Sequence, residues 1–157
     1  MLVTQNEIRT RFRRHGLRVT PQRLAIYQTL ANTTAHPTAE RLLTAVRRTL
    51  PRVSVNTIYY TLAALRKVGL VHEVNYGHER ARFDANLEPH HHVICRDCGR
   101  IIDLLDEALD QFPLQAAMPA RFMVTSHRVD IFGYCADCRS RHRRNGTQRL
   151  SSRPTRR

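Results

Sequence analysis

The sequence has no long apolar run and no serine-hydrolase motif. No stretch of its 157 residues approaches the roughly 18 consecutive apolar residues that a membrane-spanning helix needs. Its start, MLVTQNEIRTRFRRHG, reaches charged side chains before any apolar run of signal-peptide length. The Gly-x-Ser-x-Gly motif does not occur either. We therefore expect a cytoplasmic protein without a membrane segment.

Cysteine is scarce, but its spacing is informative. The four cysteines form two Cys-x-x-Cys pairs, Cys95 with Cys98 and Cys135 with Cys138. Inside a cell, such pairs favour a metal site over disulfides. Two Cys-x-x-Cys turns can bring four thiolates to one tetrahedral zinc ion. The alternatives are a redox dithiol and four unrelated core cysteines.

Charge is distributed unevenly along the chain. The formal net charge is +13, and 25 of the 26 basic residues are arginine. Residues 1–86 hold 14 Arg/Lys and 5 Asp/Glu. Residues 87–138 hold 4 Arg/Lys and 8 Asp/Glu, and residues 139–157 hold 8 arginines and no acid. The positive charge predicts a polyanionic partner. Genomic bias toward arginine is an alternative explanation, but it does not account for an acidic middle segment.

The first part of the chain, residues 1–84, has the pattern of short helices followed by a β-hairpin. Expected helix N-caps are Thr20, Thr38 and Ser54. Alternating apolar and polar residues around Tyr76-Gly77 predict the hairpin. Helices followed by a hairpin predict a winged helix-turn-helix domain. A solvated helix bundle with a basic face would show a similar pattern.

The helix expected over residues 54–68 has two different faces. Its apolar stripe consists of Val55, Ile58, Leu62 and Leu65. Short or flat polar groups suited to the major groove lie on the other face, at Ser54, Asn56, Thr57, Tyr60 and Thr61. We expect DNA contacts from Arg18, Ser54, Asn56, Thr57, Tyr59 and Tyr60.

The second part, residues 85–140, changes to an α/β pattern. The segments HHHVIC and GRIID are short strand-like runs, and LLDEALDQF is a short helix that Pro113 ends. FMVTSHRVDIFGYC has the composition of a longer strand. Residues 141–157 contain one aliphatic residue, Leu150, and predict a disordered Arg-rich tail. The whole chain is therefore expected to be α+β.

Three consecutive histidines precede the first cysteine pair. In a strand, His90 and His92 point to one side and His91 to the other. Asp84 and Asp103 flank them in the sequence. Imidazole with carboxylate is a mixed nitrogen and oxygen set that suits iron(II), manganese(II) or zinc. The alternative is a polar strand edge without metal.

Five segments together resemble the ferric uptake regulator family. In chain order they are LRVTPQRLAIYQTL, HPTAERL, VSVNTIYYTLAALRKVGLVHEV, HHHVICRDCGRIID and IFGYCADC. The resemblance covers about residues 5–140. It implies a homodimeric, metal-dependent repressor that binds a double-stranded DNA operator. It also implies an N-terminal winged helix, a C-terminal α/β dimerisation domain at residues 85–140, and structural zinc on the four cysteines.

The resemblance also implies a regulatory iron or manganese site. Its pattern falls on His36, Asp84, His90, His92 and Asp103. His36 belongs to the expected DNA-binding half, so an ion shared with His90 and His92 would connect metal binding to DNA affinity. A further family site falls on His91, Asp110 and His127, although Pro89 occupies the position of one of its usual ligands and cannot coordinate.

The two aspartates favour the peroxide-sensing branch of the family. In that branch both carboxylate ligands tend to be aspartate, and iron-catalysed oxidation falls on histidines that correspond to His36 and His90. Tyr60 departs from the pattern, because peroxide sensors often have Asn there and iron sensors Arg. We expect peroxide to be the only small molecule that acts on the protein, as its signal. The alternative is an iron- or zinc-responsive uptake regulator of the same family.

Two functions outside this family also fit parts of the sequence. One is a zinc hydrolase or thiol oxidoreductase, but a zinc closed by four cysteines has no open position for catalysis. The other is an anti-sigma or adaptor zinc module with no DNA role. We expect a regulator and no enzymatic activity.

Overall fold

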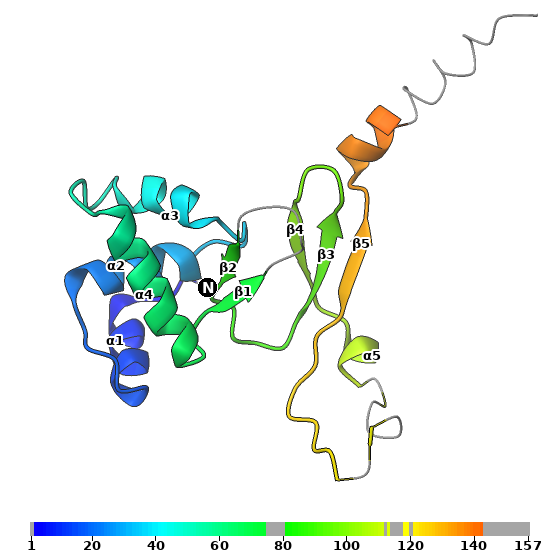
Figure 1. The fold of residues 1–157 in the computed structure, drawn as a ribbon, viewed down its shortest axis with the longest axis horizontal. Coiled ribbons are helices and arrows are strands. Elements are labelled where there is room, and N and C mark those ends of the chain that lie inside the picture. The colour runs from blue at the N-terminus through cyan, green and yellow to red at the C-terminus, as the bar shows by residue number, and fades with distance from the viewer. Residues whose placement is uncertain (1, 75–80, 112, 114–117, 120, 143–157) are drawn as a thin grey trace, which may run out of the picture. The chain divides into compact units, whose positions relative to one another are not determined.

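The computed structural model describes residues 2–74, 81–111, 113, 118–119 and 121–142 (Figure 1). The chain divides into two compact units, Met1–Glu88 and Pro89–Arg157, and each is described by itself. This boundary lies four residues beyond the one expected after residue 84. None of the described helices combines the length and apolar character that crossing a bilayer requires.

The first unit contains four helices whose N-termini are set by side-chain caps. They are α1 (Gln5–Arg14), α2 (Pro21–Ala31), α3 (Ala39–Val46) and α4 (Val55–Lys67). Each cap hydroxyl accepts a hydrogen bond from the backbone N–H three residues later, at Thr4, Thr20, Thr38 and Ser54. The last three caps confirm the sequence prediction, because a short oxygen-bearing side chain satisfies an otherwise unpaired helix N–H.

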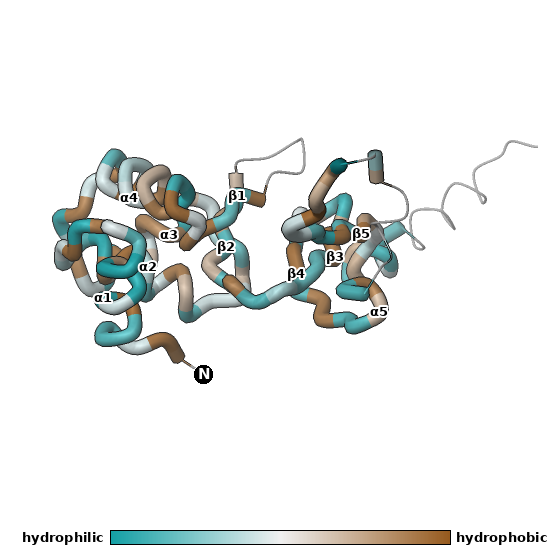
Figure 2. Tube along the Cα trace, turned by 90° about the horizontal axis from the view of Figure 1, so that it is seen from below, coloured by the Kyte–Doolittle hydropathy of each residue, from teal (hydrophilic) through white to brown (hydrophobic). Residues whose placement is uncertain are grey.

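The helices enclose one apolar core. Along the first unit in Figure 2, apolar stretches alternate with polar ones, as amphipathic helices require. In the core, the rings of Phe12 and Tyr27 meet edge to face with centroids 5.4 Å apart. Two expectations for α4 are wrong. Thr61 is buried at 3% exposure because it lies on the inward face with Ile58 and Leu65, and Val55 is 40% exposed because the first turn extends beyond the core.

A two-stranded antiparallel sheet completes the first unit. It consists of β1 (His72–Val74) and β2 (Arg82–Asp84), and the turn expected at Tyr76-Gly77 lies outside the described residues. A second connection holds the loop before α3 against β2. Thr38 forms an isolated bridge with Arg82, and the Phe83 N–H donates to the Pro37 carbonyl at 3.0 Å. These bonds place His36 near the end of β2.

The second unit contains a three-stranded sheet of order β4-β3-β5 (Figure 1). Its strands are β3 (His91–Cys95), β4 (Ile101–Leu104) and β5 (Asp130–Gly133). β4 pairs antiparallel with the central β3, and β5 pairs parallel with it. The short helix α5 (Glu107–Asp110) begins at an Asp106 cap. A further helix spans residues 136–142.

Two expectations for the second unit need correction. The strand expected over residues 122–135 is confined to β5, because its register with β3 begins only at His92 and Asp130. The Val129 carbonyl accepts the His92 N–H at 3.0 Å just before that point. Arg141 and His142 do not belong to the disordered tail expected over residues 141–157, because they lie in the helix at 136–142. Residues 143–157 lie outside the described residues.

Candidate metal centres

The two cysteine pairs meet because β3 and β5 are parallel neighbours. Cys95 ends β3, and the register pairs it with Gly133, two residues before Cys135. Each pair forms a tight turn: the Gly99 N–H donates to the Cys95 carbonyl, and the Arg139 N–H donates to the Cys135 carbonyl. Gly99 has a φ of +63°, which a residue without Cβ adopts readily.

The four sulfurs fit a tetrahedral zinc ion. All four Sγ atoms lie within 4.8 Å of one another, and those of Cys98 and Cys135 are 3.8 Å apart. Zinc–sulfur bonds of about 2.3 Å give a tetrahedron with edges of about 3.8 Å. All four cysteines are free thiols, which excludes disulfides within this structure. The geometry therefore favours zinc over the redox and core alternatives.

Backbone and side-chain groups around the sulfurs tune their protonation. Burial acts to raise the pKa of Cys95, but N–H groups of Cys135, Cys98 and Asp97 together outweigh it and lower that pKa to about 6. Burial and the neighbouring thiols raise the pKa of Cys138 to about 12, although Arg141 donates to its sulfur at 2.8 Å. Zinc must therefore displace the proton of Cys138, whereas Cys95 gives up its proton more readily.

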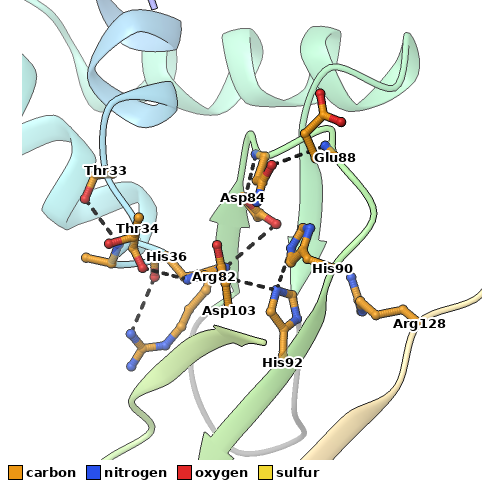
Figure 3. A network of polar contacts seen from close by, with 12 residues as sticks. Thr33, Thr34, His36, Arg82, Asp84, Glu88, His90, His92, Asp103 and Arg128 are labelled. Carbon is orange, nitrogen blue, oxygen red and sulfur yellow. Dashed lines mark hydrogen bonds and ion pairs between the residues drawn. The ribbon is translucent and has the colours of Figure 1, made fainter. Parts of the chain in front are cut away.

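His36 and Asp84 form a buried pair in the first unit. His36 is 2% exposed and Asp84 is 6% exposed, and His36 Nε2 lies 3.7 Å from Asp84 Oδ2. His36 Nδ1 is 3.1 Å from the Thr34 carbonyl, which can only accept, so Nδ1 donates this hydrogen bond and Nε2 is the nitrogen that faces Asp84 (Figure 3). Asp84 Oδ1 accepts the Asn86 N–H at 2.7 Å, which leaves Oδ2 directed at the histidine.

The backbone at His36 is strained. Its φ of +45° lies in the left-handed region, which is uncommon for residues with a Cβ and costs about 1–3 kcal/mol. The loop holds this conformation through the bonds of Pro37 and Thr38 to β2. Such strain is common at binding sites, where the surrounding structure fixes a side chain in the position that function needs.

His90, His92 and Asp103 form a second set within the second unit. Each offers one ligand atom, and these atoms lie within 4.8 Å of one another. The Nε2 atoms of His90 and His92 are 3.0 Å apart, so the two rings point to the same side, as strand alternation predicts (Figure 3). Asp103 is the register partner of His92 on β4, with Oδ1 3.9 Å from His92 Nε2.

One residue beside this set was not anticipated from the sequence. Asp130, the first residue of β5, has Oδ1 3.5 Å from His92 Nδ1 and 3.1 Å from Arg128 Nε. The signal in the sequence was weak: an acid inside an otherwise apolar strand segment. Its partner depends on the parallel register of β3 and β5, which no local pattern reveals.

His91, Asp110 and His127 do not all converge. His91 Nε2 lies 3.3 Å from Asp110 Oδ1, and the Val129 N–H donates to His91 Nδ1 at 3.1 Å. The His127 ring centroid is 6.0 Å from that of His91, and His127 Nε2 donates to the Leu109 carbonyl at 2.7 Å. The structure thus brings His91 and Asp110 together, whereas the His127 Nε2 is hydrogen-bonded to the Leu109 carbonyl. A metal at this location remains a prediction.

The expected DNA-contacting residues lie on the surface of the first unit. Tyr60 is 78% exposed and Tyr59 is 47% exposed, with the Tyr59 hydroxyl 3.4 Å from Glu40 Oε1. Arg18 and Asn56 are also exposed. Ser54 and Thr57 are engaged with each other through their hydroxyls at 2.9 Å, as part of the α4 cap. The free polar surface of α4 therefore centres on Asn56 and Tyr60.

Residues 14–132 match the ferric uptake regulator family. The chain belongs to this family. It is 40% identical over 132 residues to the peroxide-responsive repressor PerR of Staphylococcus saprophyticus, covering 84% of this chain and 89% of that protein. It is 42% identical over 123 residues to the peroxide operon regulator of Bacillus subtilis, covering 78% of this chain and 85% of that protein.

A solved structure supports the same assignment. The Campylobacter jejuni peroxide stress regulator superposes with a TM-score of 0.66 at 25% sequence identity, covering 87% of this chain and 99% of that one. The family assignment confirms the resemblance seen in the sequence segments. As a ferric uptake regulator family member, the chain has a mixed helix and sheet fold with a four-cysteine site that fits zinc.

Proposed function

We propose that the protein is a metal-dependent transcriptional repressor that responds to peroxide through oxidation of its iron-bound histidine ligands. The carrying observation is a histidine and aspartate set separate from the closed four-sulfur set. Both carboxylates are aspartates, Asp84 and Asp103, and the chain is 40% identical to a protein named peroxide-responsive repressor. In this proposal the four cysteines hold a structural ion, and the histidines and aspartates hold the regulatory ion.

The regulatory ion is proposed to take its ligands from both units. His36 and Asp84 belong to the first unit, and His90, His92 and Asp103 belong to the second. His90 follows Asp84 by only six positions, so the chain allows their Cα atoms to be no more than about 20 Å apart. An ion that binds both pairs selects one arrangement of the units, and this selection connects metal occupancy to DNA affinity.

Iron(II) held by these residues would supply the one-electron chemistry that activates peroxide beside its ligands. In the net reaction one oxygen atom passes from hydrogen peroxide to an imidazole carbon, and water leaves. The protein's contribution is to fix the orientation of the His36 ring through its Nδ1–H and the Thr34 carbonyl. An oxidised imidazole would no longer hold the ion, and the two units would lose that constraint.

DNA binding is assigned to the first unit and dimerisation to the second. The basic charge of residues 1–86 and the exposed Asn56 and Tyr60 on α4 support operator contact. The register of the sheet places Val93, Ile102 and Ile131 side by side, and Ile102 and Ile131 are 51% and 41% exposed. A second copy of the chain would cover this apolar face. We propose a cytoplasmic homodimer without enzymatic activity.

Fluorescence anisotropy with an operator duplex tests this function. Zinc-loaded protein should bind the duplex when iron(II) or manganese(II) is added and release it after peroxide only in the iron(II) form. Manganese(II) does not readily make the one-electron step. Release that follows free iron or zinc alone, with no effect of peroxide, would instead identify a metal-uptake regulator.

A further inference from the structure

His92 lies between two aspartates in the three-stranded sheet. The β3–β4 register pairs it with Asp103, and the β3–β5 register pairs it with Asp130. The histidine side chain is fully buried, while the two carboxylate side chains are 21% and 26% exposed. The carboxylates approach different ring nitrogens: Asp103 Oδ1 is 3.9 Å from Nε2, and Asp130 Oδ1 is 3.5 Å from Nδ1.

This arrangement favours one tautomer of His92. A neutral imidazole carries one N–H, and a proton on Nδ1 would point at the Asp130 carboxylate. Nε2 then keeps its lone pair and accepts the N–H of His90 Nε2, 3.0 Å away. The opposite tautomer would place the Nδ1 lone pair against a carboxylate oxygen, so two acceptors would face each other. Only the first tautomer satisfies both contacts.

Asp130 is itself held in place. Arg128 Nε donates to the same Oδ1 atom at 3.1 Å, with the arginine side chain 34% exposed. An ion pair this close to solvent contributes little to stability. Its effect is to hold the Asp130 carboxylate in the position where it faces His92. Asp130 lies on the Nδ1 side of the ring, away from the nitrogen that faces His90 and Asp103.

We propose that Asp130 is a positioning residue for the regulatory ion, which holds the His92 proton on Nδ1 and so presents Nε2 to the metal. This inference rests on the proposed function, in which His92 is a ligand. A carboxylate that accepts the second N–H of a ligating histidine fixes its orientation and raises its basicity, and its loss costs about 10–100-fold in metal affinity. Asp103 and Asp130 are thus both register partners of His92, but Asp103 is a proposed metal ligand and Asp130 a positioning residue.

Manganese(II) titration of the zinc-loaded full-length protein, followed by electron paramagnetic resonance, tests the affinity. Asp130→Ala should weaken manganese binding by about 10–100-fold. Asp130→Asn should weaken it less, because the amide oxygen still accepts the Nδ1 proton. The matched control is Asp137→Asn, since Asp137 is 74% exposed and pairs with Arg100 outside this set. The control should bind manganese as the wild type does.

Asp103→Asn distinguishes failure of this inference from failure of the proposed function. If Asp103→Asn loses manganese and Asp130→Ala binds it as tightly as the wild type, the role of Asp130 is overturned and the proposed site stands. If neither change affects affinity, the ion binds elsewhere and both are overturned. Zinc content and thermal melting confirm that each variant is folded.

Nitrogen-15 NMR of the manganese-free protein provides a readout that does not depend on metal binding. Wild-type His92 should be protonated at Nδ1, and Asp130→Ala should shift it toward the Nε2-protonated form. A merely structural role for Asp130 would leave this equilibrium unchanged. A wild-type His92 protonated at Nε2 would overturn the inference, whatever the affinities show.

Discussion

At the residue scale, two of the candidate histidine ligands, His36 and His92, are oriented by a contact of the ring nitrogen that does not face the metal set. His36 donates from Nδ1 to the Thr34 carbonyl, and His92 has Nδ1 against Asp130. Both rings therefore direct Nε2 toward a carboxylate that offers a second ligand, Asp84 in one unit and Asp103 in the other. The strained backbone at His36 holds its ring in the position that metal binding needs.

Asp103→Glu tests the meaning of the paired aspartates. We expect the variant to bind operator DNA with iron(II) but to respond to peroxide several-fold more slowly, because the longer carboxylate can occupy the coordination position that peroxide needs. The rate of DNA release after peroxide, followed by anisotropy, measures this. Asp106→Glu, at the α5 cap, is the control and should respond as the wild type does. An unchanged rate in Asp103→Glu would show that the carboxylate type does not set peroxide sensitivity.

Cys95→Ser tests the sulfur set. The protein should lose zinc and with it much of the second unit's stability, since structural zinc contributes roughly 10 kcal/mol or more of apparent folding free energy. Size-exclusion chromatography should show a largely monomeric, unstable protein, and metal analysis should show no zinc. Ser140→Ala, just beyond Cys138, is the control for substitution near the set. A stable, zinc-free dimer of Cys95→Ser would refute the structural role.

At the element scale, α4 carries the proposed DNA contact. Tyr60 is 78% exposed and contributes nothing to the core, so Tyr60→Ala should leave the melting temperature unchanged. It should lower operator affinity, or alter its sequence preference, by about 1–3 kcal/mol for a base contact. Asn6→Ala on the exposed side of α1 is the control. If Tyr60→Ala changes neither affinity nor preference, another face of the unit contacts DNA.

Elements that depend on local chemistry were predictable from the sequence, and those that depend on register were not. Thr20, Thr38 and Ser54 cap helices because a hydroxyl satisfies a nearby N–H whatever lies further away. The inward rotation of Thr61 and the short β5 depend on tertiary packing. The role of Asp130 likewise required the parallel pairing of β3 and β5, between segments 38 residues apart at His92 and Asp130.

At the scale of the whole molecule, the charge divides into a basic front, an acidic middle and a basic end. The last segment, residues 143–157, carries six arginines and no acid. We expect these arginines to attract phosphate through their charge, a contact that carries no base information. Deleting residues 143–157 should weaken binding to all duplexes similarly and reduce the salt dependence. A loss confined to the operator would mean that this segment reads sequence.

The position of that truncation matters. Arg141 donates to Cys138 Sγ at 2.8 Å, and His142 Nε2 lies 2.7 Å from Asp97 Oδ2, within the first cysteine turn. A deletion that begins at residue 140 should therefore also lower zinc retention, whereas one that begins at residue 143 should not. The rate of zinc release to a chelator should be compared between the two truncations. The comparison separates the loss of positive charge from the loss of contacts around the four cysteines.

The central claim is that peroxide acts by oxidising the histidine ligands of the regulatory ion. Mass spectrometry of the iron(II)-loaded protein after peroxide tests it most directly, with the manganese(II) form as control and DNA binding measured on the same samples. We predict one added oxygen on His36 or His90, intact cysteines and loss of DNA binding in the iron form, with neither change in the manganese form. DNA release with unmodified histidines, or with oxidised cysteines in their place, would contradict the account.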